Sequence, residues 1–181
     1  MVERANTVHP FPAEAAPRWR HRSLPPSSAP WRAAAFPEKS VHLRRLGTMD
    51  SNVIDVDTSR RRLVDLTDEV RGFCGSRRDG LCNVFVPHAT AGLAIIETGA
   101  GSDDDLVDTL ERLLPRDDRY RHAHGSFGHG ADHVLPALVS PSVTIPVQDG
   151  CPLLGTWQSI VLVDLNRDNP RRSVRLSFLG A

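Results

Sequence analysis

Apolar residues alternate with other residues in three short runs near the C-terminus. The alternating positions are Val143, Ile145 and Val147, then Val161, Val163 and Leu165, and then Val174, Leu176 and Phe178. Because successive side chains of a strand point to opposite faces, a period of two predicts strands with one buried face each. Turn-forming Gly, Pro and Asn residues separate the runs, so we expect half-buried antiparallel strands.

The residues before these runs predict further strands and two or three helices. We expect strands over 53–57, 81–86 and 89–97, and helices over 67–75, 102–114 and 132–139. Thr67 and Ser102 are the expected N-caps, because their hydroxyls can accept bonds from the first free N–H groups. Pro115 should end the second helix, and Pro136 should disturb the third. Helices within a mostly antiparallel sheet system indicate the α+β class.

Residues 1–48 differ in composition from the remainder. They hold seven of the 14 prolines, and eight basic side chains against three acidic ones. Proline at this density removes backbone donors and fixes φ, so we predict a disordered Pro/Arg-rich extension. Met49 begins a segment that reads as folded, so two interpretations stay open: a mis-assigned start, or a solvated tail. We expect residues 49–181 to form a single domain that carries the chemistry.

The composition argues against several classes of protein. A formal net charge of zero gives no general attraction to nucleic acid or to an anionic membrane. No apolar run approaches the roughly 20 residues of a transmembrane helix. The three cysteines show no CxxC spacing, so we expect free thiols and a cytoplasmic location. No P-loop, Rossmann or GxSxG motif occurs.

Five of the eight histidines fall between residues 88 and 133, namely His88, His122, His124, His129 and His133. Imidazole is the common ligand of zinc-type metals and the usual acid or base near neutral pH. The last four could place two or three nitrogens around one ion, and a solvated Gly/His loop is the alternative. His129 and His133 would share a helix face only if a helix begins before His129, against which Gly130 argues.

Further candidate residues lie at the ends of predicted elements. His88 and Glu97 sit at strand ends, where a side chain is well held for acid–base work. Asp105 could supply a carboxylate to Mg²⁺, with a helix-dipole role as the alternative. In the segment 155–158 (Gly-Thr-Trp-Gln), the glycine lets the backbone come close to a ligand, and the tryptophan offers a face for stacking. The glutamine amide offers both a donor and an acceptor. Arginines at 167–175 suit phosphate, unless they are an ordinary surface charge run.

Two of these segments resemble a known family. The stretch 142–150 (Ser-Val-Thr-Ile-Pro-Val-Gln-Asp-Gly), followed by 155–158, is similar to the signature of the YjbQ family. That family is also called uncharacterised protein family 0047, or secondary thiamine-phosphate synthase. Other matching positions are His88 to Ala91, Glu97, Asp105, Pro115, Tyr120 to His122, His133 and Arg172. The resemblance covers 49–181 and none of 1–48.

The resemblance implies a fold, an assembly and a site. The fold would be YjbQ-like: two packed, mostly antiparallel sheets in a sandwich, with two or three short helices. The assembly would be a homotrimer with a polar cleft shared between subunits. The implied catalytic residues are His88, Glu97, His133 and Gln158. The implied substrate-binding residues are Thr90, Thr156, Trp157 and Arg172. The expected metal ligands, for Mg²⁺ or Zn²⁺, are His122, His129, His133 and Asp105.

The chain also departs from the family pattern. Ile96 stands where asparagine is common, Ala100-Gly101 where Asp-Pro is common, and Gly128-His129 where Asp-Asn is common. Two amide side chains are thereby lost and one imidazole is gained, which could alter the choice of metal or ligand.

Three hypotheses for function follow. In the first, the chain joins a pyrimidine diphosphate to a thiazole phosphate and releases pyrophosphate, as the family's synthase activity implies. In the second, His122, His129 and His133 bind a zinc-type ion of a metal-dependent hydrolase. In the third, the chain is a non-catalytic trimeric binder of a phosphorylated metabolite. All three expect a phosphorylated small molecule as partner.

Overall fold

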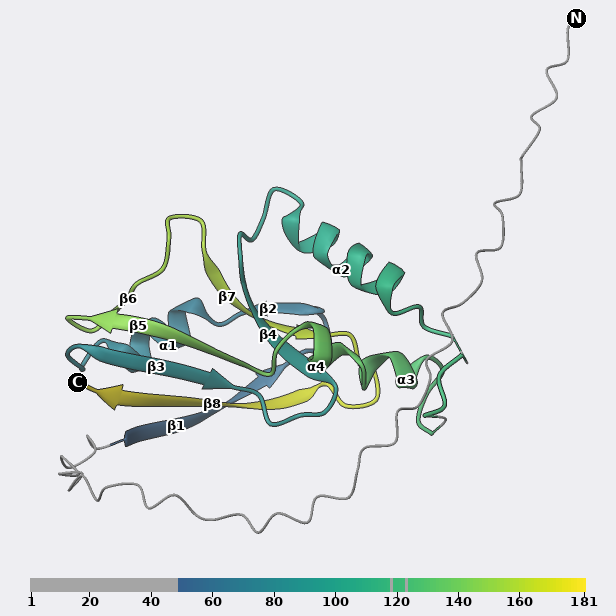
Figure 1. Ribbon diagram of the computed structural model, residues 1–181, viewed down its shortest axis with the longest axis horizontal. Coiled ribbons are helices and arrows are strands. Elements are labelled where there is room, and N and C mark those ends of the chain that lie inside the picture. The colour runs from purple at the N-terminus through teal and green to yellow at the C-terminus, as the bar shows by residue number, and fades with distance from the viewer. Residues whose placement is uncertain (1–48, 118, 123) are drawn as a thin grey trace, which may run out of the picture. The chain divides into compact units, whose positions relative to one another are not determined.

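The computed structural model describes residues 49–117, 119–122 and 124–181 (Figure 1). The predicted extension 1–48 lies outside the described residues. The described residues form eight strands: β1 (Met49–Asp57), β2 (Leu63–Asp65), β3 (Gly80–Phe85), β4 (Ala91–Ile96), β5 (Ser142–Gln148), β6 (Cys151–Pro152), β7 (Ser159–Asp164) and β8 (Arg171–Gly180). The helices in the same ranges are α1 (Thr67–Cys74), α2 (Ser102–Leu113), α3 (His129–Asp132) and α4 (Leu135–Leu138).

The strands form two sheets in which every pairing is antiparallel. The larger sheet has the order β1-β8-β3-β5-β6, and the smaller has the order β2-β7-β4. One face of each sheet contributes to a shared core, which includes Val84, Ile145 and Leu176 from the larger sheet and Leu93 and Leu162 from the smaller. The predicted α+β fold of two packed antiparallel sheets is therefore confirmed.

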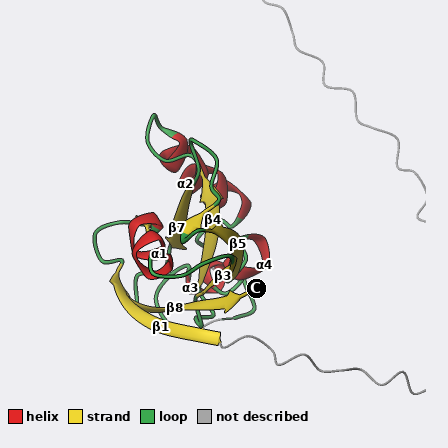
Figure 2. Cartoon of the chain, turned by 90° about the vertical axis from the view of Figure 1, so that its left-hand side faces the viewer, coloured by secondary structure: helices red, strands yellow, loops and turns green. Residues whose placement is uncertain are grey.

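The smaller sheet is covered on both faces. Ile160 and Leu162 of β7 pack into the core between the sheets, whereas Val161 and Val163 pack against Leu110 of α2 and its neighbours. Figure 2 shows α2 on the side of β4 and β7 that lies away from β1 and β8. The prediction that this strand is half-buried was wrong, because the face that alternation assigned to solvent, with Ile160 and Leu162, packs into the core between the two sheets.

The starts of the two longer helices differ from the prediction. Thr67 is the first residue of α1, and its hydroxyl accepts the N–H of Ile160 at 2.9 Å instead of capping the helix. The N-cap is Leu66, which makes no side-chain capping bond, and the carboxylate of Asp65 accepts the N–H of Thr67 at 2.8 Å. In α2 the N-cap is Gly101, with φ of 95°, and Ser102 is already helical.

The segment predicted as loop and disturbed helix contains two single helical turns. The first, α3, begins at His129, and α4 carries Pro136 near its start, where a missing N–H costs nothing. In the described part of the chain α3 does not begin before His129, but the single turn that begins there is enough to bring His129 and His133 together. Within the described ranges, none of the helices has the length and apolar character that crossing a membrane requires.

Candidate functional site

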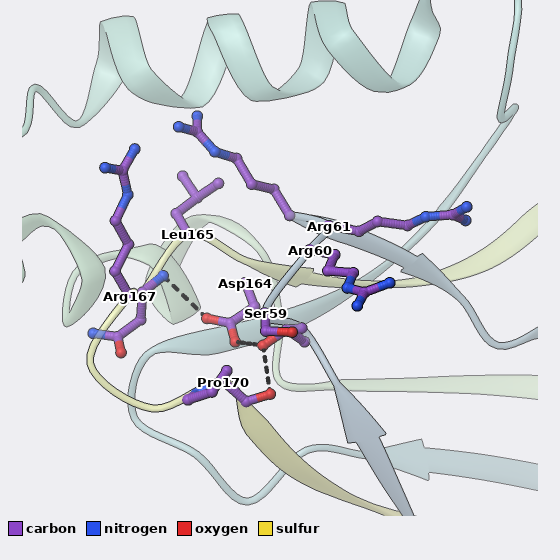
Figure 3. Close-up of a pocket in the computed structure, with 10 residues that line it drawn as sticks. Ser59, Arg60, Arg61, Asp164, Leu165, Arg167 and Pro170 are labelled. Atoms are coloured by element: carbon purple, nitrogen blue, oxygen red, sulfur yellow. Dashed lines mark hydrogen bonds between the residues drawn. The ribbon is translucent and has the colours of Figure 1, made fainter.

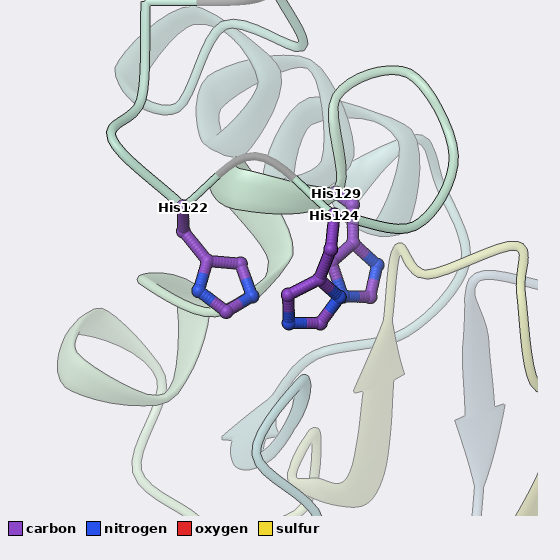
Figure 4. Close-up of side chains that lie close together, drawn as sticks. All are labelled: His122, His124 and His129. Carbon is purple, nitrogen blue, oxygen red and sulfur yellow. The ribbon is translucent and has the colours of Figure 1, made fainter.

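Four imidazoles gather where the connection after α2 enters α3. His122 and His124 belong to the connection, His129 is the first residue of α3, and His133 is its C-cap. Gly125 makes the close approach possible, since it has φ of +83° and an added Cβ would lie 2.7 Å from the His129 ring. The chain therefore folds back so that His122 and His124 lie near His129 (Figure 4), and the rings of His122 and His133, eleven positions apart, have centroids 4.2 Å apart.

The geometry of this histidine cluster (His122, His124, His129 and His133) suits one small cation. Ligand nitrogens of the first three lie within 4.8 Å of one another, and Nε2 of His133 lies 2.9 Å from Nε2 of His129. Nitrogens bound tetrahedrally at the usual Zn–N length lie about 3.3 Å apart, so small ring rotations would complete such a site. His122 and His124 are exposed, so the cluster opens to solvent.

Asp168 orients the most buried of these rings. Its Oδ2 lies 2.7 Å from Nδ1 of His129, which makes Nδ1 the protonated nitrogen and leaves the Nε2 lone pair facing the cluster. Hydrogen bonds from Ser126, followed by the bond from His129, hold the pKa of the Asp168 carboxyl below its usual range. A carboxylate–histidine pair of this kind is the usual support of a metal-binding imidazole.

A buried network fixes the base of the cluster. Asp132 is 1% exposed, and its carboxylate accepts bonds from Arg116 and from Nδ2 of Asn166, the latter at 2.9 Å. Asn166 Nδ2 also lies 3.2 Å from Nδ1 of His129. Since both α3 and the connection after β7 are tied to this network, the ring of His129 has little freedom to turn.

The local environment favours the neutral form of two rings of the cluster, His122 and His133. Loss of water contact, followed by the neighbouring imidazoles of His124 and His129, lowers the pKa of His122. Burial, followed by His122, lowers the pKa of His133. A lowered pKa means that these rings carry free lone pairs at neutral pH, which is the state that binds a metal.

A second group of predicted residues lies apart from the cluster. His88 accepts the N–H of Ser173 at Nε2, at 3.1 Å. Arg172 is 2% exposed, and its Nε and Nη2 both donate to the buried Asp164, at 2.6 and 3.0 Å. Thr90 is 8% exposed at the same end of β4. This geometry points to a structural role for Arg172, whose predicted role in binding substrate stays a prediction.

A third group lies at the opposite end of the smaller sheet. Glu97, Thr156, Trp157 and Gln158 line a depression of about 290 Å³ together with Arg71. Trp157 is 73% exposed, and the side chain of Gln158 accepts the N–H of Gly155 at 2.8 Å.

The pairing of β4 with β7 explains this separation. Ala91 pairs with Asp164, and Ile96 pairs with Ser159, so Thr90 and Glu97 flank opposite ends of β4. Six strand residues span roughly 17–20 Å. Asp105 lies in the first turn of α2 and is not among the residues whose ligand atoms converge. A single cleft holding all the predicted residues is not formed within one chain.

The groups that hold the cluster, Asp132, Asn166 and Asp168, are not among the residues that the sequence predicts for the site. The only sequence signal for Asp168 is its position in a polar turn directly after a predicted strand. Its pairing with His129, 39 residues away, is set by the tertiary structure.

Comparison with protein families gives one match. The model of a family described as UPF0047 protein YjbQ-like matches residues 52–181. A UPF0047 protein of Mycobacterium tuberculosis is 82% identical over 131 residues, which are 72% of this chain and 98% of the relative. A UPF0047 protein of Archaeoglobus fulgidus is 34% identical over 122 residues, which are 67% of this chain and 95% of the relative.

Solved structures give the same result. A YbjQ-like protein of unknown function from Sulfolobus solfataricus aligns with a TM-score of 0.66 at 26% identity, covering 74% of this chain and all of that one. A YjbQ/UPF0047 protein from Clostridium acetobutylicum aligns with a TM-score of 0.63 at 27% identity, covering 71% of this chain and 99% of that one.

Proposed function

Because the chain belongs to the UPF0047 family of YjbQ-like proteins, a family whose membership names no activity, we propose from its own residues that it is a metal-dependent hydrolase. The observation that carries the proposal is the histidine cluster, in which three imidazoles converge and Asp168 fixes one of them. Three protein nitrogens with an open side are typical of a catalytic zinc site, whereas a structural site is closed by four ligands.

The donor set favours a zinc-type ion over Mg²⁺. Imidazole suits zinc and neighbouring transition metals, whereas Mg²⁺ prefers oxygen ligands. An ion of this type would supply a nucleophile at neutral pH by lowering the pKa of water toward about 7. His122, His124 and His129 would hold it, and Asp168 would keep the proton on Nδ1 of His129.

His133 has a separate role in this proposal. Because Nδ1 of His129 carries the proton toward Asp168, the 2.9 Å contact makes His133 Nε2–H the donor and His129 Nε2 the acceptor. Engagement of His129 Nε2 by an ion would end that hydrogen bond. The lowered pKa of His133 keeps its imidazole neutral. Once that bond is lost, the ring can take the other neutral tautomer, with its proton on Nδ1, and the freed Nε2 lone pair can accept a proton beside the reacting centre.

The experiment uses the full-length protein, stripped with chelator and reloaded with Zn²⁺ or Mn²⁺, against a panel of phosphomonoesters and phosphodiesters. We expect metal-dependent turnover that falls 100-fold or more in His133→Gln, a loss on the order of that from removing a general base. Asp104→Asn, at an exposed position on α2, is the control and should retain full activity. Turnover that is unchanged in His133→Gln would contradict the proposed role.

The depression at the other end of the sheet favours a second candidate, the thiamine-phosphate synthase activity. It gathers Glu97, Thr156 and Gln158 beside an exposed indole face and the Arg71 guanidinium, which suit an aromatic substrate with a charged leaving group. Formation of thiamine phosphate from the two phosphorylated precursors and Mg²⁺, abolished in Gln158→Ala but not in His133→Gln, would select this candidate. Tight binding of both precursors without turnover would instead favour a non-catalytic binder.

We also propose the assembly and the compartment. The depression and the histidine cluster lie at different ends of one chain, so a shared cleft requires a second copy, as in the homotrimer that the resemblance implies. All three cysteines are free, with Cys74 and Cys82 buried and Cys151 exposed, which fits the reducing cytoplasm.

A further inference from the structure

A basic hollow lies next to the histidine cluster, between the β1–β2 and β7–β8 connections. Its volume is about 430 Å³, and four arginines line it: Arg60, Arg61, Arg62 and Arg167. Figure 3 shows Arg60 and Arg167 on the two connections, on either side of Ser59 and Asp164. The sequence predicts a phosphate role only for Arg167 among these four, because the two connections lie about 100 residues apart in the chain.

The carboxylate in this hollow, Asp164, accepts two hydrogen bonds at each of its oxygens. Asp164 Oδ2 accepts bonds from Thr58 at 2.7 Å and from Arg172 at 2.6 Å. Its Oδ1 accepts bonds from Arg172 at 3.0 Å and from the N–H of Asn166 at 3.1 Å. Asp164 therefore neutralises the buried Arg172 and is not free to pair with the arginines of the hollow.

The arginines of the hollow are mostly unpaired. Arg62 forms an ion pair with Glu111, whereas Arg60, Arg61 and Arg167 form none with any residue that the structure describes. Acidic residues near the start of α2 share a neighbouring hollow with Arg61 and Arg62, so they moderate the charge on that side. Arg60 and Arg167 are the pair left for an anion.

The hollow and the histidine cluster share one wall. Asn166 lines the hollow, and its side chain lies 3.2 Å from Nδ1 of His129. Two residues further on, Asp168 binds the same nitrogen. A small molecule held in the hollow would thus have one side-chain layer between it and the cluster.

We infer that this hollow is a phosphate-binding subsite, in which the forks of Arg60 and Arg167 and the hydroxyl of Ser59 hold a terminal phosphate of the substrate. Arginine forks match phosphate oxygens bidentately, and a hydroxyl adds a further donor. The assignment of this phosphate to a substrate rests on the proposed hydrolase function. The substrate class is then a small molecule with a terminal phosphate and a second, reacting ester bond.

Calorimetric titration of the full-length, metal-free protein with inorganic phosphate and with pyrophosphate tests the subsite. We expect the dissociation constant for phosphate to rise on the order of tenfold or more in the double variant Arg60→Gln/Arg167→Gln, because each charge-assisted hydrogen bond contributes strongly to binding. The control, Arg78→Gln/Arg175→Gln, removes the same charge at exposed positions elsewhere and should change the constant less than about twofold.

Equal weakening in both double variants, or no binding by the wild-type protein at millimolar phosphate, would overturn the subsite. Because the titration contains no metal, its outcome is independent of the hydrolase proposal. Phosphate binding without metal-dependent turnover would contradict the hydrolase and keep the subsite. If the Arg60→Gln/Arg167→Gln protein turns over subsaturating substrate as fast as the wild-type protein, the subsite is contradicted and the hydrolase is kept.

Discussion

At the scale of single residues, the candidate site depends on which nitrogen of an imidazole is free. The sequence located His122, His129 and His133 by their density and by family resemblance. It could not locate Asp168, whose 2.7 Å contact decides that Nε2 of His129 faces the cluster. Nor could it show that Arg172, a candidate for phosphate, is buried against Asp164. Residue types could be predicted, but tautomers and pairings depend on tertiary contacts.

His88 gives a residue-scale prediction about pH. Burial, followed by the charge of Arg172, lowers the pKa of His88, so the folded chain binds this proton more weakly than the unfolded chain does. The resulting stability is present above the unfolded pKa of about 6.5 and is lost as the pH falls below it. In His88→Gln, which can still accept the N–H of Ser173, the free energy of unfolding should therefore fall less between pH 7 and pH 5.

Urea unfolding of both proteins at the two pH values measures this difference. His122 and His133 titrate in the same range, but they are present in both proteins and cancel in the comparison. An identical pH dependence in the two proteins would show that His88 is not held neutral by the fold.

At the scale of elements, the strands were more predictable than the helix ends. Alternation placed β5, β7 and β8, because a period of two follows directly from strand geometry. It could not show that β7 is buried on both faces, since that depends on α2 packing over it. The N-caps of α1 and α2 were each misplaced by one residue, and in α1 the predicted cap Thr67 bonds to β7 instead.

Two identical substitutions in different elements should have opposite effects. In β4, a Cβ at Gly92 would lie 2.2 Å from the carbonyl oxygen of Val139, so Gly92→Ala should destabilise the fold by about 1–3 kcal/mol. In α1, nothing lies within 4 Å of a Cβ at Gly72, so Gly72→Ala should be neutral or stabilise the fold by up to about 1 kcal/mol. Thermal unfolding of the two variants measures both effects, and a harmless Gly92→Ala would contradict the close approach of β4 and Val139.

At the scale of the whole molecule, the register of β4 against β7 organises the candidate sites. It places the depression at one end of the smaller sheet and Asp164 at the other, from which the connection leads to Asp168. A sequence can predict the strands, but this separation follows from how they pair. The family resemblance therefore assigned to one cleft residues that lie at the two ends of the smaller sheet within one chain.

If a neighbouring copy completes a shared cleft, the protein should be a trimer in solution. Light scattering on the eluted peak should then give about 60 kDa, three times the chain mass of 19.9 kDa. A mass near 20 kDa that does not change with concentration would contradict the shared cleft and leave each candidate site to act alone.

The central claim is that the histidine cluster binds a zinc-type ion, and calorimetric titration of the chelator-stripped, full-length protein with Zn²⁺ tests it most directly. We predict one tight site per chain in the wild-type protein and in the control Asp104→Asn. The site should be lost in His122→Ala/His129→Ala and weakened about 10- to 100-fold in Asp168→Asn, since support of a ligand by a carboxylate is worth that much. Equal Zn²⁺ affinity in the wild-type protein and the double histidine variant would contradict the claim.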